Sequence, residues 1–262
     1  MTIDAVFVQD GEWFTATDLG LGPWAPGALH GGAVAALLVH LLTEHVAGLP
    51  LRPARITYDF VRPVPPGPLR AELEVVRPGR RVTLLDAVLR DGDQTEVVRA
   101  RALMVVPSQI GPTPASPPPF PGPDEGRVND WHDGRRMFAT AGMEIRFVQG
   151  RFREPGPAIA WFRLAAPLIA GQPVLPIERI AAAGDFGNGI ASELSWDEHV
   201  FINPDLTLYI EREPVGEWVA LESEMRVMPD SVAVAESVLW DERGRVGRAT
   251  QSLLVGARPG AT

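Results

Sequence analysis

The hydrophobic pattern along the chain predicts the same succession of elements twice. In the first 106 residues, the run 33–45 is apolar almost all round, which is typical of a buried helix. A short strand is expected before this helix, at residues 10–18. Runs typical of strands follow it at 55–62, 69–77, 82–90 and 95–106. One buried helix followed by consecutive antiparallel strands is an α+β pattern, with a sheet on a central helix.

The second half of the chain repeats this order. A strand is expected at 158–164, and a helix is expected at 177–191, although glycines at 184, 187 and 189 weaken it. Strands are then expected at 206–211, 218–227, 231–240 and 246–255. We therefore predict two copies of one α+β module in a single chain.

Two pairs of similar segments support a duplication. Arg62 and Arg212 lie in similar segments, and so do Arg99 and Arg248, so the offset is 150 positions in one case and 149 in the other. Between the copies, eight prolines fall within the 17 residues from Pro107 to Pro123, which cannot form an interior helix or a central strand. We predict an N-terminal module at 1–106, a proline-rich linker at 107–129 and a C-terminal module at 130–262.

Composition narrows the possible functions. The chain has 262 residues and a formal net charge of −9, and every base is an arginine, so there is no Schiff-base or phosphate-loop lysine. The acidic balance argues against a nucleic-acid partner. There is no cysteine, and the start of the chain lacks a basic, apolar leader, so we expect a soluble, cytoplasmic protein without membrane insertion.

Three polar residues occur in the second copy only. Gln251 aligns with Ala102 of the first copy and shares a strand face with apolar residues, so its amide should be buried and bonded. Asp185 lies in the weak second helix, and Asn203 lies in a turn. Each has a structural alternative: an amide bonding backbone, a local cap and an ordinary turn, respectively. A shared fold does not explain polar groups that only one copy carries, so together they indicate a site.

Other familiar chemistries find little support. With no cysteine and no HExxH motif, a metal site is not expected. No serine lies in a G-x-S-x-G context, so a serine triad is unsupported. His30 is expected to cap the first helix, and the glycines at 31 and 32 either pack tightly or offer free N–H groups. The arginine-rich turn at 77–81 is either a solvated hairpin or a contact for phosphates.

The order of these motifs resembles the double-hotdog acyl-CoA thioesterases of the thioesterase II type, from about Phe14 to Val255. Residues 29–33 (LHGGA) resemble the start of that family's first helix. Trp218, two residues after Gly216, and the closing residues 249–251 (ATQ) resemble its second hotdog. The resemblance implies a tandem hotdog fold, in which each half is a curved antiparallel sheet wrapped on one central helix.

The resemblance also implies an activity and a site. The family holds and activates a water with an Asp, a Thr and a Gln, and these positions fall at Asp185, Asn203 and Gln251, so the chain departs from the family at Asn203. The expected reaction is hydrolysis of acyl-CoA to the free acid and CoA, with Asp185 as the base and no cofactor. The expected binding residues are His30, Gly31, Gly32 and Ala36, with the acyl chain running along the first helix.

Two other functions remain open. A hydratase or dehydratase on the same fold needs an Asp–His pair, and His199 is the only histidine near the second-copy residues in sequence. A non-catalytic acyl-binding protein would keep the fold without turnover, which the Asn203 departure makes credible. An oligomer of double-hotdog units is possible for each of these functions.

Overall fold

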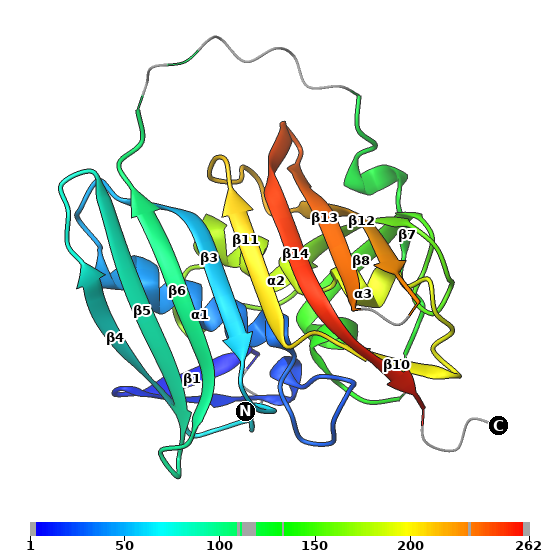
Figure 1. Cartoon of the computed structure of the whole chain (residues 1–262), viewed down its shortest axis with the longest axis horizontal. Coiled ribbons are helices and arrows are strands. Elements are labelled where there is room, and N and C mark those ends of the chain that lie inside the picture. The colour runs from blue at the N-terminus through cyan, green and yellow to red at the C-terminus, as the bar shows by residue number, and fades with distance from the viewer. Residues whose placement is uncertain (1–3, 109–110, 112–118, 133, 230–231, 259–262) are drawn as a thin grey trace.

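The structure is a computed structural model that describes residues 4–108, 111, 119–132, 134–229 and 232–258. It is an α+β fold, as expected (Figure 1). The first half contains β1 (Phe7–Asp10), β2 (Trp13–Ala16), η1 (Asp18–Gly20), α1 (Gly31–His45), β3 (Arg52–Phe60), β4 (Leu69–Arg77), β5 (Val82–Asp91) and β6 (Glu96–Val105). The second half contains η2 (Pro123–Glu125), β7 (Arg127–Val128), a π-helical turn η3 (Phe138–Gly142), β8 (Met143–Gln149), β9 (Ala158–Leu164), α2 (Pro176–Gly184), α3 (Gly187–Ile190), β10 (His199–Ile202), β11 (Asp205–Ile210), β12 (Val219–Val227), β13 (Ala233–Asp241) and β14 (Gly244–Ala257).

The strands of both halves belong to one sheet. Within the described residues it has 14 strands in the order β1-β2-β4-β5-β6-β3-β11-β14-β13-β12-β9-β8-β7, and β10 pairs with β14 beside this path. Neighbouring strands of this order are antiparallel, including β3 and β11, where the two halves meet (Figure 1). The halves are therefore joined by backbone hydrogen bonds as well as by the chain.

The register at this junction confirms the alignment of the two copies. Thr57 lies directly opposite Thr207, and their hydroxyl oxygens are 3.2 Å apart. Because these residues are 150 positions apart, a pseudo-two-fold axis passes between them. On the next strands, Arg101 faces Thr57 and Thr250 faces Thr207, so the following residues, Ala102 and Gln251, occupy equivalent places.

The helices lie on one face of the sheet and touch each other (Figure 1). Helix α1 contacts β3, β4 and β5, whereas α2 contacts β9, β11, β12 and β13. As the apolar pattern predicts, α1 is buried almost throughout its length, so it fills the core instead of facing solvent. None of the helices in the described residues is long and apolar enough to cross a membrane.

Two expected elements differ in the structure, and three strands were not expected. The helix expected at 177–191 is two pieces, α2 and α3, because the chain turns at Asp185 and Phe186. The strand expected at 10–18 is the hairpin β1–β2, in which Gly11 has φ +60°, a conformation that glycine adopts without steric cost. Strands β7, β8 and β10 were not predicted from the sequence.

Part of the predicted linker lies outside the described residues, namely 109–110 and 112–118. After it, Phe120 stacks on Trp240 with ring centroids 4.4 Å apart, and Trp161 donates its ring N–H to the Pro121 carbonyl at 2.9 Å. This end of the linker therefore packs against the C-terminal half. The expected boundaries at 106, 129 and 130 stay a prediction.

Candidate active site

The site begins at the turn that separates α2 from α3. The glycines around this turn let the helices approach the sheet closely. A Cβ at Gly184 would lie 2.7 Å from Leu208 Cδ2, and a Cβ at Gly187 would lie 2.7 Å from Ser237 Oγ. The same glycines that weaken the predicted helix therefore allow the break that carries Asp185. The Asp185 side chain is only 5% exposed.

Gln251 bridges this helix break from strand β14. Its Nε2 donates to the Asp185 carbonyl oxygen at 3.1 Å and lies 3.3 Å from Asp185 Oδ1, and its Oε1 accepts from the Asn188 N–H at 3.1 Å. The side chain is 1% exposed, so these bonds satisfy its amide, as a buried amide requires. Gln251 thus fixes the backbone of the turn and the carboxylate that the turn presents.

Two asparagines complete the support of the carboxylate. Asn203, between β10 and β11, donates from Nδ2 to Asp185 Oδ1 at 2.8 Å and to the Asp205 carbonyl oxygen at 3.1 Å. Asn188 is 3% exposed and donates to the Phe201 carbonyl oxygen at 3.4 Å and to Asn203 Oδ1 at 3.5 Å. Asp185 Oδ1 therefore accepts amide hydrogens, and Oδ2 is left for other partners.

The start of α1, from the other half of the chain, faces Asp185 Oδ2. A Cβ at Gly31 would lie 2.7 Å from this oxygen, so only glycine lets the helix start come so near. A Cβ at Gly32 would instead lie 2.5 Å from the Ala182 carbonyl oxygen of α2. The positive end of the α1 dipole therefore faces the carboxylate.

His30, the N-cap of α1, also contacts Asp185. Its Nδ1 lies 3.1 Å from Asp185 Oδ2 and 3.0 Å from the Gly32 N–H. Depending on the tautomer, Nδ1 either carries a hydrogen and donates to Asp185 or has a lone pair and accepts from the Gly32 N–H. The ring of Phe186 stacks on the imidazole at 4.4 Å and holds it in place. The first copy thus supplies the histidine of an Asp–His contact that the spacing in sequence did not predict.

A second acid–histidine contact joins the same two helices. His40 Nδ1 of α1 lies 2.7 Å from Glu178 Oε1 of α2, and both side chains are buried. The other Glu178 oxygen accepts from the Leu175 N–H at 3.1 Å and caps α2. The contact therefore joins α1 to α2 inside the core.

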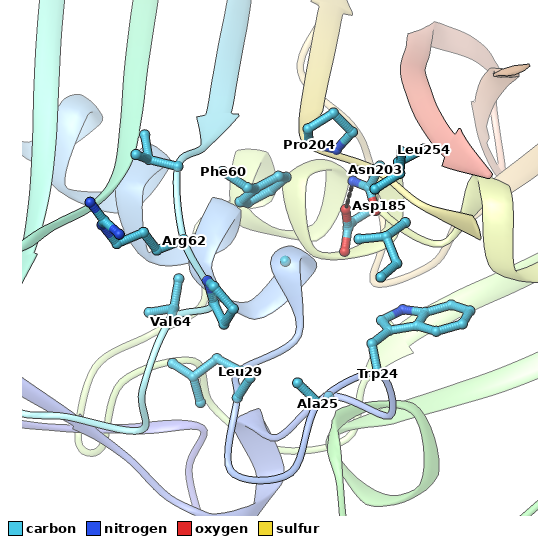
Figure 2. A pocket seen from close by; sticks show the side chains of 16 residues that line it. Trp24, Ala25, Leu29, Phe60, Arg62, Val64, Asp185, Asn203, Pro204 and Leu254 are labelled. Atoms are coloured by element: carbon cyan, nitrogen blue, oxygen red, sulfur yellow. Dashed lines mark hydrogen bonds between the residues drawn. The ribbon is translucent and has the colours of Figure 1, made fainter. Parts of the chain in front are cut away.

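An apolar pocket of about 270 Å³ reaches Asp185, Asn203 and Gly31. Asp185 is buried at the inner end of the pocket, and Figure 2 shows it beside Asn203, with Trp24 and Arg62 on opposite sides. The remaining lining is mostly apolar and comes from Gly22, Ala25, Ala28, Leu29, Phe60, Val61, Pro63, Val64, Ile202, Pro204 and Leu254. A concave apolar site with a few converging polar groups is the usual form of a small-molecule site.

A second, much smaller cavity of about 20 Å³ also touches Asp185. It is bordered by His30 and Asn188 and by a set of aromatic rings from Trp24, Trp131, Phe152, Phe186 and Trp196. A space of this size has room for one water, and its three polar side chains are suitable partners. Trp24 borders both cavities and stacks on Trp196 at 4.8 Å.

The structure brings together most of the residues that the sequence nominated. Asp185, Asn203, Gln251, His30 and Gly31 are linked by the contacts above. Gly32 lies next to them and packs against α2. Ala36 is fully buried in α1 and does not line either cavity, so its role in binding the acyl group stays a prediction.

Sequence reasoning missed Asn188, Trp24 and Arg62 as members of the site. Asn188 had a visible signal, because it is a polar residue between two glycines in an otherwise apolar segment. Trp24 and Arg62 carried no such signal, since loops bring them to the pocket. His199, the histidine considered for a hydratase, lines neither cavity.

Comparisons with known proteins agree with this geometry. The sequence model of the acyl-CoA thioesterase C-terminal domain matches residues 113–255, and that of the acyl-CoA thioesterase N-terminal domain matches residues 21–105. No curated protein matches the sequence.

Solved structures share the fold over nearly the whole chain. A hot dog fold protein of unknown function from Alicyclobacillus acidocaldarius is 17% identical, covers 97% of each chain and has a TM-score of 0.73. A candidate thioesterase from Novosphingobium aromaticivorans is 22% identical over 95% of this chain and 98% of its own, with a TM-score of 0.72. An acyl-CoA thioesterase II of Mycobacterium marinum is 12% identical over 97% of both chains, with a TM-score of 0.68. At these identities the similarity establishes a hotdog-type fold with a large antiparallel sheet.

Proposed function

The chain belongs to the acyl-CoA thioesterase family and is a thioester hydrolase, and we propose that it cleaves acyl-CoA by a water that Asp185 activates. The observation that carries the proposal is the convergence, at one apolar pocket, of Asp185 and Asn203 from the second copy and the helix start at Gly31 from the first, with Gln251 buried behind the carboxylate. No residue of the chain needs to form a covalent intermediate.

The proposed reaction starts with attack by water. Asp185 Oδ2 takes a proton from the water as its oxygen bonds to the thioester carbon. The carbonyl oxygen becomes an oxyanion, and the N–H of Gly31 is the proposed donor, because the first turn of a helix leaves such groups without an intrahelical acceptor. The Gly32 N–H is already close to His30. When the tetrahedral intermediate collapses, the C–S bond breaks and the CoA thiolate takes the proton from Asp185.

Asn203 and Gln251 have a supporting role in this proposal. Both side chains donate to Asp185 Oδ1, so they fix the carboxylate with its second oxygen toward Gly31 and His30. The sequence suggested that both amides aim the water. The amide of Gln251 is fully engaged with Asp185 and Asn188, which favours a positioning role for it. An asparagine in place of the family threonine still donates to the aspartate.

The direct test is release of free thiol from a panel of acyl-CoA thioesters of different chain length and with aryl groups. The proposal expects saturable hydrolysis of at least one thioester, with the free acid and CoA formed in equal amounts. Failure to hydrolyse any member while binding persists would favour the non-catalytic acyl-binding alternative.

Gln251→Ala separates turnover from binding. We expect kcat to fall about tenfold or more because Asp185 loses a partner, while the Kd for a non-hydrolysable acyl-CoA thioether changes little. The variant also leaves a buried carbonyl and N–H unpaired, so the free energy of unfolding should fall by about 1–3 kcal/mol. Steady-state kinetics measures kcat, and calorimetry on the same preparation measures the Kd and the free energy of unfolding. Gln149→Ala, at the exposed last residue of strand β8, is the matched control and should change none of these quantities.

His30→Gln and His40→Gln form a matched pair, since each histidine lies on or next to α1 and contacts a buried acid. We expect His30→Gln to lower kcat about tenfold or more, because Asp185 Oδ2, the oxygen of the proposed base, loses its contact with the imidazole. We expect His40→Gln to keep kcat and to lower the free energy of unfolding by about 1–3 kcal/mol. Kinetics and thermal unfolding of both variants decide the matter. Equal kinetic losses in the two variants would remove His30 from the site.

Hydration of an enoyl-CoA is a second candidate because of one observation, the 3.1 Å contact between His30 and Asp185. Such chemistry needs an acid and a base on one face of the substrate. Loss of enoyl thioester absorbance without release of thiol distinguishes this reaction from hydrolysis.

Three further statements belong to the proposal of an acyl-CoA thioesterase. Each half of the chain is a sheet wrapped on one central helix. The enzyme is cytoplasmic, and it assembles from double-hotdog units.

A further inference from the structure

The mouth of the pocket carries one cation. Of the sixteen residues that line the pocket, only Asp185 and Arg62 are charged, and Asp185 is buried at the inner end, whereas Arg62 is exposed. Figure 2 shows the Arg62 side chain directed away from Asp185, on the segment that follows β3. Its backbone is held, since the N–H groups of Val61 and Arg62 both bond the Val97 carbonyl oxygen, at 3.0 and 3.1 Å.

Among the described residues, no carboxylate lies within ion-pair distance of Arg62. The equivalent arginine of the second copy does form an ion pair, so the fold itself does not require this arginine to be unpaired. Arg212, 150 positions later, makes a two-pronged ion pair with Asp241, at 2.5 and 2.6 Å. Asp91 stands 150 positions before Asp241 and also ends its strand. Its Oδ1 accepts from the N–H groups of Asp93 and Thr95 instead, at 3.0 and 2.9 Å. Of the two equivalent arginines, Arg212 is therefore held by an ion pair, whereas Arg62 has no such partner among the described residues.

We propose that Arg62 binds a phosphate group of the CoA moiety of the substrate; the inference rests on the proposed function. The phosphates of CoA are separated from the thioester by the pantetheine arm, so their partner should lie at the mouth of the pocket and not beside Asp185. A guanidinium presents several donors in a plane and matches phosphate oxygens. On a chain with net charge −9, an unpaired cation at the mouth also offsets repulsion of an anionic substrate.

The arginine-rich turn at 77–81 is not in a position to take this role. Strands β5 and β6 place Val82 opposite Val105, which is also the partner of Arg52 at the first residue of β3. The pocket lies at the other end of β3, at Phe60. Strand β3 has nine residues, so its two ends lie roughly 26 Å apart. Arg80 in this turn is therefore a suitable control: it is exposed and remote from the site.

The test compares wild type, Arg62→Ala and Arg80→Ala with three thioesters of one acyl group: acyl-CoA, acyl-dephospho-CoA and acyl-pantetheine. Binding of CoA itself is measured by calorimetry, which does not depend on turnover. We expect Arg62→Ala to raise the KM for acyl-CoA and the Kd for CoA about tenfold, the scale of one charge-assisted hydrogen bond. Arg80→Ala should match wild type, and acyl-pantetheine should be hydrolysed equally by all three proteins.

The substrate series identifies the phosphate. An effect that disappears with acyl-dephospho-CoA assigns Arg62 to the 3′-phosphate, and one that persists there but is absent with acyl-pantetheine assigns it to the diphosphate. An unchanged Kd for CoA in Arg62→Ala, or an equal loss with acyl-pantetheine, overturns the inference. A wild type that hydrolyses no thioester contradicts the proposed function alone, because the CoA titration still tests Arg62.

Discussion

Asp185→Asn is expected to lower kcat for acyl-CoA hydrolysis at least about 10²-fold, the scale of losing a general base, with little change in KM. The substitution should leave the fold intact. The asparagine Oδ1 can still accept from Asn203 and Gln251, and its Nδ2 takes the place of Oδ2, where it can donate to His30 Nδ1. Steady-state kinetics over a range of acyl-CoA concentrations measures both constants.

The control for this prediction is Asp124→Asn, the same change at an exposed residue remote from the pocket. It should match wild type in kcat and in melting temperature. If Asp185→Asn kept the wild-type kcat, Asp185 would not be the base, and the role of the surrounding amides would have to be reconsidered. Since no change in folding is expected, the two variants should also have the same circular dichroism spectrum.

Gly31→Ala is expected to lower kcat roughly 10- to 100-fold without loss of stability. Neither Gly31 nor Gly32 has a positive φ, so alanine suits the backbone of the helix start at both positions. The new methyl group of Gly31→Ala would lie 2.7 Å from Asp185 Oδ2 and displace the carboxylate, and small displacements of reacting groups have effects of this size. Steady-state kinetics measures kcat of the variant and of wild type, and thermal unfolding of both proteins checks that the stability is unchanged.

Gly32→Ala is the matched comparison, one residue further along. Its methyl group would lie 2.5 Å from the Ala182 backbone carbonyl oxygen, which cannot rotate away, so α1 and α2 must move apart. We expect the free energy of unfolding to fall by about 1–3 kcal/mol as a result of overpacking. A Gly31→Ala variant with wild-type kcat would mean that the contact between the helix start and Asp185 has no part in catalysis.

The repeat, and the strand that carries Gln251, could be predicted from the sequence because both depend on the periodicity of apolar residues along the chain. The 150-position offset predicted that Ala102 and Gln251 are equivalent, and the strand register confirms it. An amide on an apolar strand face must find partners, and Gln251 finds Asp185 and Asn188. The family resemblance added Asp185 and Asn203, whose structural alternatives sequence alone left open.

The contact of His30 with Asp185 could not be predicted, because 155 positions separate the two residues and nothing local links them. It depends on how α1 and α2 cross, which in turn depends on Gly32 and Ala182 approaching closely. The break between α2 and α3 was also missed. Glycines indicated a weak helix, but the position of the break is set by bonds from Gln251 on a distant strand. Tertiary contacts decided both features.

Strands β3 and β11 pair where the two halves meet, so each would become an edge strand if the halves were separated. Each half alone would expose one long strand, with its row of N–H and C=O groups unpaired, and such an edge readily pairs with other chains and aggregates. Each half expressed separately should therefore aggregate. The two halves should form a soluble complex when they are mixed, because each supplies the strand that pairs with the exposed edge of the other. In the intact chain the linker raises the effective concentration of one edge for the other, so correct pairing outcompetes association with foreign strands.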